Sequence, residues 1–122
     1  MSGLLEISEE IGTEARVVAI AGELDMHSVG EARLPLERAA SDVGRALVID
    51  LSGCDFIDST GLATIVHLTR PLRENGSGVS LVCPPGDVRK LLELAAINLT
   101  FPIHDRLDDA LANGAGAQSS SS

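Results

Sequence analysis

The run Ala46-Leu47-Val48-Ile49-Asp50-Leu51 constrains the fold more than any other segment of this sequence. It is almost continuously apolar, with β-branched residues at its centre, and only Asp50 interrupts it. Such a run is typical of a strand covered on both faces, because a strand with one face in solvent alternates apolar and polar residues. We therefore predict that residues 46–51 form the central strand of a sheet.

The segment before this strand has the pattern of a hairpin followed by a helix. Residues 5–11 and 15–21 are β-type runs whose close spacing indicates two hairpin strands. The chain is then expected to turn at residues 22–25, and Ser28 can cap the helix that follows. Pro35 lies inside this helix and is expected to kink it or delay its start. The apolar face of the helix would consist of Val29, Ala32, Leu36 and Ala39 or Ala40.

A second helix is predicted to begin at Ser59 and to end near Asn75-Gly76. Its helical spacing places His67 and Pro71 away from the core. Residues 79–83 then form another short apolar run, which predicts a buried strand. The core face of the helix would consist of Leu62, Ile65, Val66, Thr69 and Leu72.

The last part of the chain predicts two helices around one short strand. Pro84-Pro85-Gly86 opens the first helix, and residues 99–103 are the strand candidate. Asp105 can cap a terminal helix that runs through Leu111. The Gly-, Ala- and Ser-rich residues 113–122 read as a disordered tail. The apolar face of the first helix would consist of Val88, Leu91, Leu92 and Ala95.

These elements follow the order ββαβαβαβα, in which the later strand–helix–strand connections require parallel neighbours joined by right-handed crossovers. We predict an α/β sandwich in which helices pack against a mixed sheet of about four to five strands. The chain is 44% hydrophobic, enough for one domain to bury a core without disulfide or metal staples. That domain is expected to span residues 1–112.

The charge of the chain argues against nucleic acid and membrane partners. Nine basic and eighteen acidic residues give a net charge of −9, which repels phosphate backbones and anionic lipid surfaces. Phe56 and Phe101 are the only aromatic residues, so stacking on nucleobases is not expected. The N-terminus has no secretory pattern, and no run approaches the length of a membrane span. We expect a cytoplasmic protein whose partner is a protein with a basic or apolar docking surface.

The sequence predicts no metal, no cofactor and no catalytic residues. The two cysteines, Cys54 and Cys83, have no second pair to complete a zinc site, and a cytosolic protein is not expected to join them in a disulfide. The histidines are widely spaced and lack the pattern of a metal-binding helix. Ile57 replaces the first glycine of a nucleophile elbow around Ser59, and no phosphate-binding nucleotide motif is present.

The run Asp58-Ser59-Thr60-Gly61-Leu62 carries the functional hypothesis. A strand that ends at Asp58-Ser59 and feeds a helix would place Ser59 at the helix N-terminus. The unpaired N–H groups there favour a phosphate or carboxylate, and Gly61 would keep the turn open to an approaching enzyme. From the residue types and their spacing alone, the favoured interpretation is that Asp58 or Ser59 acts only as a helix cap.

The chain resembles the bacterial anti-sigma factor antagonists of the STAS (sulfate transporter and anti-sigma antagonist) domain family. The resemblance extends from Leu5 to Leu111 and is specific because several landmarks occur together. These landmarks are Gly22-Glu23-Leu24-Asp25, Val48-Ile49-Asp50-Leu51-Ser52, Phe56-Ile57-Asp58-Ser59-Thr60-Gly61-Leu62 and Val88-Arg89-Lys90-Leu91-Leu92-Glu93-Leu94.

The resemblance implies that Ser59 is a phosphoacceptor. The unphosphorylated domain would bind an anti-sigma factor that is also an ATP-dependent serine kinase, and a sigma factor would be released. Phosphorylation of Ser59 would cancel this binding, and a separate serine phosphatase would restore it. The docking face would include Asp25, Asp58, Ser59, Thr60, Gly61 and Leu62, with Met26, His27 and Ser28 as weaker candidates.

A different class of function is compatible with the same motif. A STAS-type domain can be a constitutive structural subunit of a lipid-transport complex or of a larger stress-signalling assembly, without a phosphorylation switch. Nothing in residues 58–62 distinguishes this alternative from the switched antagonist. Phosphate transfer to Ser59 by a cognate kinase would separate the two.

Overall fold

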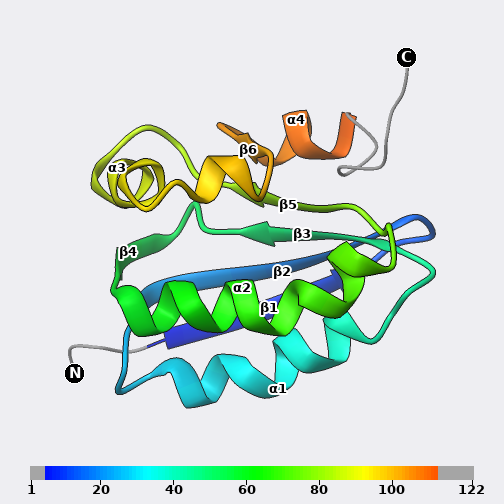
Figure 1. Cartoon of the computed structure of the whole chain (residues 1–122), viewed down its shortest axis with the longest axis horizontal. Coiled ribbons are helices and arrows are strands. Elements are labelled where there is room, and N and C mark those ends of the chain that lie inside the picture. The colour runs from blue at the N-terminus through cyan, green and yellow to red at the C-terminus, as the bar shows by residue number, and fades with distance from the viewer. Residues whose placement is uncertain (1–4, 113–122) are drawn as a thin grey trace.

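A computed structural model describes residues 5–112 and shows a mixed α/β fold (Figure 1). The sheet has six strands in the order β1-β2-β3-β5-β6, and β4 pairs with the end of β2 outside this path. The strands are β1 (Leu5–Ile11), β2 (Ala15–Leu24), β3 (Ala46–Asp50), β4 (Cys54–Ile57), β5 (Val79–Val82) and β6 (Ile103–His104). The helices are α1 (Val29–Ala40), α2 (Ser59–Glu74), α3 (Asp87–Leu94), the short 3-10 helix η1 (Ile97–Leu99) and α4 (Leu107–Ala112).

The topology confirms the predicted fold class. β1 and β2 form an antiparallel hairpin, whereas the pairs β2–β3, β3–β5 and β5–β6 are parallel. β3 is the middle strand, as the apolar run at residues 46–51 predicted. The predicted tail at residues 113–122 lies outside the described residues. Within residues 5–112, no helix has both the length and the apolar character needed to cross a bilayer.

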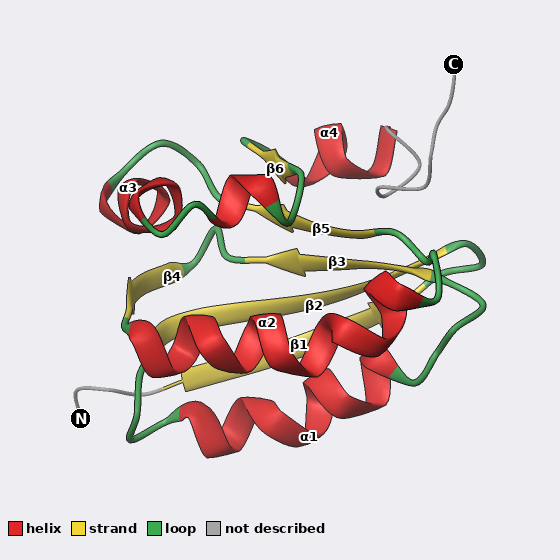
Figure 2. Cartoon of the chain, viewed as in Figure 1, coloured by secondary structure: helices red, strands yellow, loops and turns green. Residues whose placement is uncertain are grey.

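The two faces of β3 explain why its sequence is apolar throughout. Leu47 and Ile49 point into the larger core cluster, which α1, α2 and α3 cover. Val48 points to the opposite face and joins a smaller cluster with Val82 and Ala110, under α4. Each buried aliphatic side chain of this kind contributes about 1.5–3 kcal/mol, so the central strand anchors layers on both sides of the sheet (Figure 2).

Strand β4 is the main departure from the predicted element order. The prediction placed a strand before Ser59 but did not count it separately from residues 46–51, whereas β4 is a distinct strand after a tight turn. It pairs in parallel with residues Gly22 to Leu24, with a register shift between Gly22 and Glu23. The expected turn at residues 22–25 was therefore wrong, because β2 continues through Leu24 to pair with β4.

The region after β5 also differs from the prediction. The expected strand at residues 99–103 was wrong, since Leu99 belongs to η1 and only Ile103–His104 pairs with β5. Val88 and Leu92 of α3 are buried as predicted, whereas Leu91 and Ala95 are exposed. α3 ends at Leu94, so it buries only a narrow stripe.

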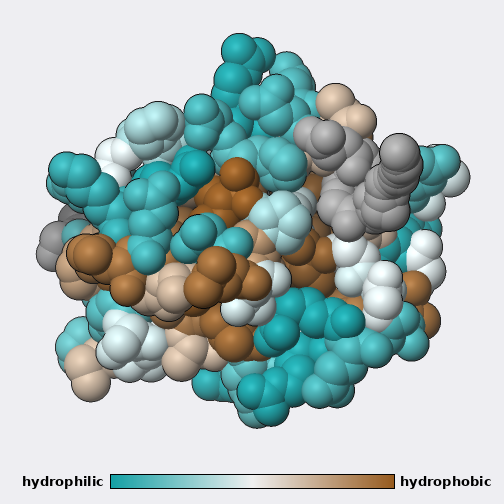
Figure 3. Space-filling view, turned by 45° about the horizontal axis from the view of Figure 1, so that its top comes forward, coloured by the Kyte–Doolittle hydropathy of each residue, from teal (hydrophilic) through white to brown (hydrophobic). Residues whose placement is uncertain are grey.

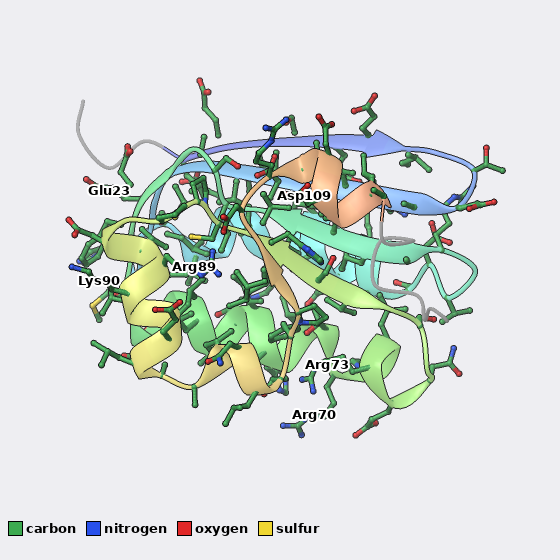
Figure 4. The ribbon with its side chains drawn as sticks, turned by 90° about the horizontal axis from the view of Figure 1, so that it is seen from above. Glu23, Arg70, Arg73, Arg89, Lys90 and Asp109 are labelled. Atoms are coloured by element: carbon green, nitrogen blue, oxygen red, sulfur yellow. The ribbon has the colours of Figure 1, made fainter. Side chains whose placement is uncertain are left out.

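Two polar residues of this region have structural roles that the sequence did not indicate. Asp105 does not cap α4, which begins at Leu107, but accepts a hydrogen bond from Arg89 Nη1 at 2.9 Å. The same Nη1 donates to the carbonyl oxygen of Cys83 at 2.6 Å, and the Arg89 side chain is only 21% exposed. Figure 4 shows Arg89 directed toward the strands and Lys90 directed away from them. Arg89 therefore packs against the end of β5, although its neighbour Lys90 points to solvent.

Candidate functional site

Ser59 is the first residue of α2 and is exposed, at the end of the sheet where β2 and β4 terminate (Figure 2). The preceding residue, Asp58, has extended backbone and caps the helix, because its Oδ1 accepts a hydrogen bond from the Gly61 N–H at 2.9 Å. The capping role that the residue types allowed is thus filled by Asp58, which leaves the neighbouring Ser59 hydroxyl at the surface. Thr60 is exposed beside it.

The loop between β2 and α1 lies directly beside this helix start. Asp58 Oδ2 accepts a hydrogen bond from the Met26 N–H at 3.0 Å. The Asp58 N–H in turn donates to the carbonyl oxygen of Leu24 at 3.3 Å. The structure therefore brings the predicted docking residue Asp25 and its neighbours to the same edge as Ser59, although more than thirty positions separate them in sequence.

Asp25 organises that loop through its own carboxylate. Asp25 Oδ1 accepts hydrogen bonds from the N–H groups of His27 at 2.9 Å and Ser28 at 3.0 Å. The Ser28 hydroxyl donates to the carbonyl oxygen of Glu23 at 2.6 Å, so it closes the loop and does not cap α1. Partial desolvation by itself raises the pKa of Asp25, but these hydrogen bonds and the nearby His27 outweigh it and lower the pKa below its ordinary value.

Gly61 is buried and has a packing role that differs from the predicted one. A Cβ at this position would lie 2.5 Å from the carbonyl oxygen of Leu24 and 3.0 Å from the Ile57 side chain. The absence of a side chain lets the first turn of α2 approach β2 and β4 closely. Leu62, the last residue of the motif, is half-buried against the main core. The members of the motif presented to solvent are therefore Ser59 and Thr60.

Exposed apolar side chains lie beside the start of α2 and also on α3 and η1. Met26 is 64% exposed in the loop beside Asp58, and Phe56 of β4 is also exposed. On α3 and η1, Leu94 and Leu99 are 83% and 82% exposed. Figure 3 shows a band of apolar atoms across the face that carries α3 and η1. The exposure of Leu99 was not predicted, because residue 99 was assigned to a strand.

The two cysteine thiols are buried, and burial raises the pKa of each. Cys54 and Cys83 are free and buried, and burial raises the pKa of Cys83 to about 11, so its thiol stays protonated at neutral pH. Among residues 5–112, no group of three or more His, Cys, Asp or Glu side chains is arranged to hold a metal ion.

A groove of about 410 Å³ between α1 and α2 is lined by Leu68 and Pro71 in the later turns of α2, away from Ser59.

Comparison with known proteins identifies the family. The sequence-family model of the STAS domain matches residues 5–110 of this chain. The chain belongs to the STAS domain family. The resemblance found in the sequence motifs is thereby confirmed.

Several of the proteins that this chain resembles are anti-sigma factor antagonists. An anti-sigma F factor antagonist of Paenibacillus polymyxa is 30% identical over 111 residues, covering 88% of this chain and 92% of that protein. An anti-sigma-F factor antagonist of Mycobacterium tuberculosis is 26% identical over 102 residues, covering 84% of this chain and 83% of its own. The crystal structure of an anti-sigma factor antagonist from Mycobacterium paratuberculosis superposes with a TM-score of 0.85 at 28% identity, over 97% of this STAS chain and all of that chain.

Proposed function

We propose that this STAS domain is an anti-sigma factor antagonist whose binding is controlled by phosphorylation of Ser59. In its unphosphorylated form it binds an anti-sigma factor that also has serine kinase activity, and a sigma factor is released. The observation that carries the proposal is the exposed Ser59 hydroxyl at the start of α2, next to the Asp25–Ser28 loop, in a chain whose relatives are anti-sigma factor antagonists.

The local charges explain how a phosphate on Ser59 would oppose binding. A phosphoserine carries about −1.5 to −2 charge at neutral pH, and here it would stand next to the carboxylate of Asp58 and near that of Asp25. Each unit of negative charge on this phosphate would repel a partner carboxylate about 5 Å away by roughly 1–3 kcal/mol, depending on the effective dielectric constant. One such unit would weaken binding by roughly 5- to 200-fold without any large rearrangement of the fold.

The composition of the surface supports a protein partner. The domain has a net charge of −9, and exposed apolar side chains lie on the loop, on β4 and on α3–η1. A partner with basic and apolar groups would complement both properties, whereas nucleic acid and anionic membranes would be repelled. The docking face we propose comprises Asp25, Asp58, Ser59, Thr60, Gly61 and Leu62, with Gly61 contributing through the placement of the first turn of α2.

In this proposal the domain is the substrate of a kinase and a phosphatase and has no catalytic residues of its own. The kinase supplies the phosphoryl group from ATP, and a separate serine phosphatase removes it. The reaction would take place in the cytoplasm, where the anti-sigma factor and its sigma factor act on transcription. The buried packing of Gly61 gives the kinase a rigid helix start to recognise.

The experiment is to incubate the purified domain with each candidate cognate kinase and ATP, and to map the phosphate by mass spectrometry. We expect one phosphate on Ser59 and reduced binding to the anti-sigma factor after the reaction. The variant Ser59→Ala is the matched control and should remain unmodified. Absence of phosphate on Ser59 with every such kinase, together with stable binding to a transporter or scaffold subunit, would favour a constitutive structural subunit instead.

A further inference from the structure

The loop that joins β2 to α1 uses all of its backbone donors from residue 25 to residue 29. The Asp25 N–H donates to Ser28 Oγ at 3.0 Å. The N–H groups of His27 and Ser28 donate to Asp25 Oδ1, and the Val29 N–H donates to the Asp25 carbonyl oxygen at 2.8 Å. These four donors are thus satisfied inside the loop, which Asp25 and Ser28 close on itself.

Among residues 25–29, only the Met26 N–H donates to an acceptor outside the loop. That acceptor is Asp58 Oδ2. The other oxygen of the same carboxylate holds the Gly61 N–H in the first turn of α2. One carboxylate therefore connects the tip of the loop to the turn that presents Ser59. It also fixes the backbone at Met26, whose side chain is among the most exposed apolar groups of the domain.

We propose that Asp58 is a positioning residue that couples the Met26 loop to the phosphorylation state of Ser59. The inference rests on the proposed function, since it assigns a route by which the modified residue affects a second part of the docking face. A phosphate on Ser59 is adjacent in sequence to the Asp58 carboxylate and repels it. The contact with Gly61 is partly buried, whereas the contact with Met26 is exposed to solvent, so the Met26 hydrogen bond is the one that breaks.

The variant Asp58→Asn tests the bridge in the unmodified protein. An amide has one acceptor oxygen and cannot accept from both N–H groups at their present positions, since its second terminal atom is a donor. The partly buried Gly61 contact keeps the oxygen, and the NH2 group then faces the Met26 N–H. The matched control is Asp55→Asn, which removes the same charge from the neighbouring strand at an exposed position without a hydrogen bond to the loop.

Hydrogen exchange of individual amides, followed by NMR, gives the readout. In Asp58→Asn the Met26 amide should exchange about tenfold faster or more, as expected for the loss of a hydrogen bond to a charged acceptor. The Gly61 amide should stay protected, and Asp55→Asn should leave both amides unchanged. Unchanged protection of Met26 in Asp58→Asn would overturn the bridge.

The coupling to Ser59 is tested by adding Ser59→Asp to both backgrounds. In the wild-type background the added charge should speed Met26 exchange, and in Asp58→Asn it should have no further effect. Equal acceleration in both backgrounds would overturn the coupling. These measurements need no partner. If the Met26 amide responds as predicted but the affinity for the anti-sigma factor does not depend on residue 59, the bridge is retained and the proposed function is refuted.

Discussion

The substitution Gly61→Ala tests whether close packing at the start of α2 sets the geometry of the site. The added methyl group would lie 2.5 Å from the carbonyl oxygen of Leu24 and 3.0 Å from Cγ1 of Ile57 and Cγ of Leu24. The oxygen cannot simply move, because it accepts the hydrogen bond from the Asp58 N–H. The first turn of α2 must therefore shift away from β2.

The expected size of the effect follows from two opposing contributions. Overpacking of a tight site costs about 1–3 kcal/mol, and replacing glycine by alanine within a helix returns up to about 1 kcal/mol. We expect Gly61→Ala to lower the free energy of unfolding by about 1–2 kcal/mol. For a domain of this size the melting temperature should fall by roughly 3–10 °C.

Gly30 provides the matched control. It lies in α1, is exposed, and has no atom within 4 Å of the position where a Cβ would be placed. Gly30→Ala should therefore raise the free energy of unfolding by about 0.5–1 kcal/mol. Urea unfolding and calorimetry of both variants measure the difference. A Gly61→Ala protein as stable as Gly30→Ala would refute the packing account of the glycine in the motif.

Three further predictions concern the pH dependence, the thiols and the end of β5. Because the pKa of Asp25 is lowered in the folded protein, its contribution to stability should be complete above the ordinary value of about 3.9 and lost as the pH falls below it. An NMR titration midpoint of Asp25 at or above 3.9 would contradict its hydrogen bonding. Cys83, with its pKa raised to about 11, should react with iodoacetamide at pH 8 only after unfolding, and rapid alkylation of the native protein would show that it is not buried. Arg89→Ala should lower the free energy of unfolding, measured in urea, by about 1–3 kcal/mol, because it removes the contacts to Cys83 and Asp105. The control Lys90→Ala should lower it by less than about 0.5 kcal/mol. Equal effects of the two substitutions would show that these contacts of Arg89 contribute little.

The fold class could be predicted because its strongest pattern is local. Residues 46–51 are almost continuously apolar, and such a run is typical of a central strand that is covered on both faces. β4 was not counted because its four residues follow no alternation, and its pairing with Gly22 to Leu24 depends on a contact between distant segments. Leu99 was misassigned for a similar reason, since an apolar residue in a 3-10 turn resembles the edge of a strand in sequence.

The site was predictable in its residues but not in its connections. The motif at residues 58–62 indicated a helix start, and the structure has α2 begin at Ser59 with Asp58 as its cap. No spacing rule could show that the second oxygen of Asp58 binds the Met26 N–H, because that contact depends on β2 and β4 ending side by side. The burial of Gly61 against Leu24 is likewise a property of the assembled sheet.

The affinity of the anti-sigma factor for Ser59→Ala and Ser59→Asp tests the proposed control of binding most directly. Isothermal titration calorimetry of both variants against the same partner compares a neutral and a negatively charged residue at one exposed position. The charge should weaken binding by roughly 5- to 200-fold, as repulsion of about 1–3 kcal/mol requires. Ser59→Ala should bind as tightly as the unphosphorylated wild type. Equal affinities for Ser59→Ala and Ser59→Asp would contradict the placement of Ser59 in the docking face.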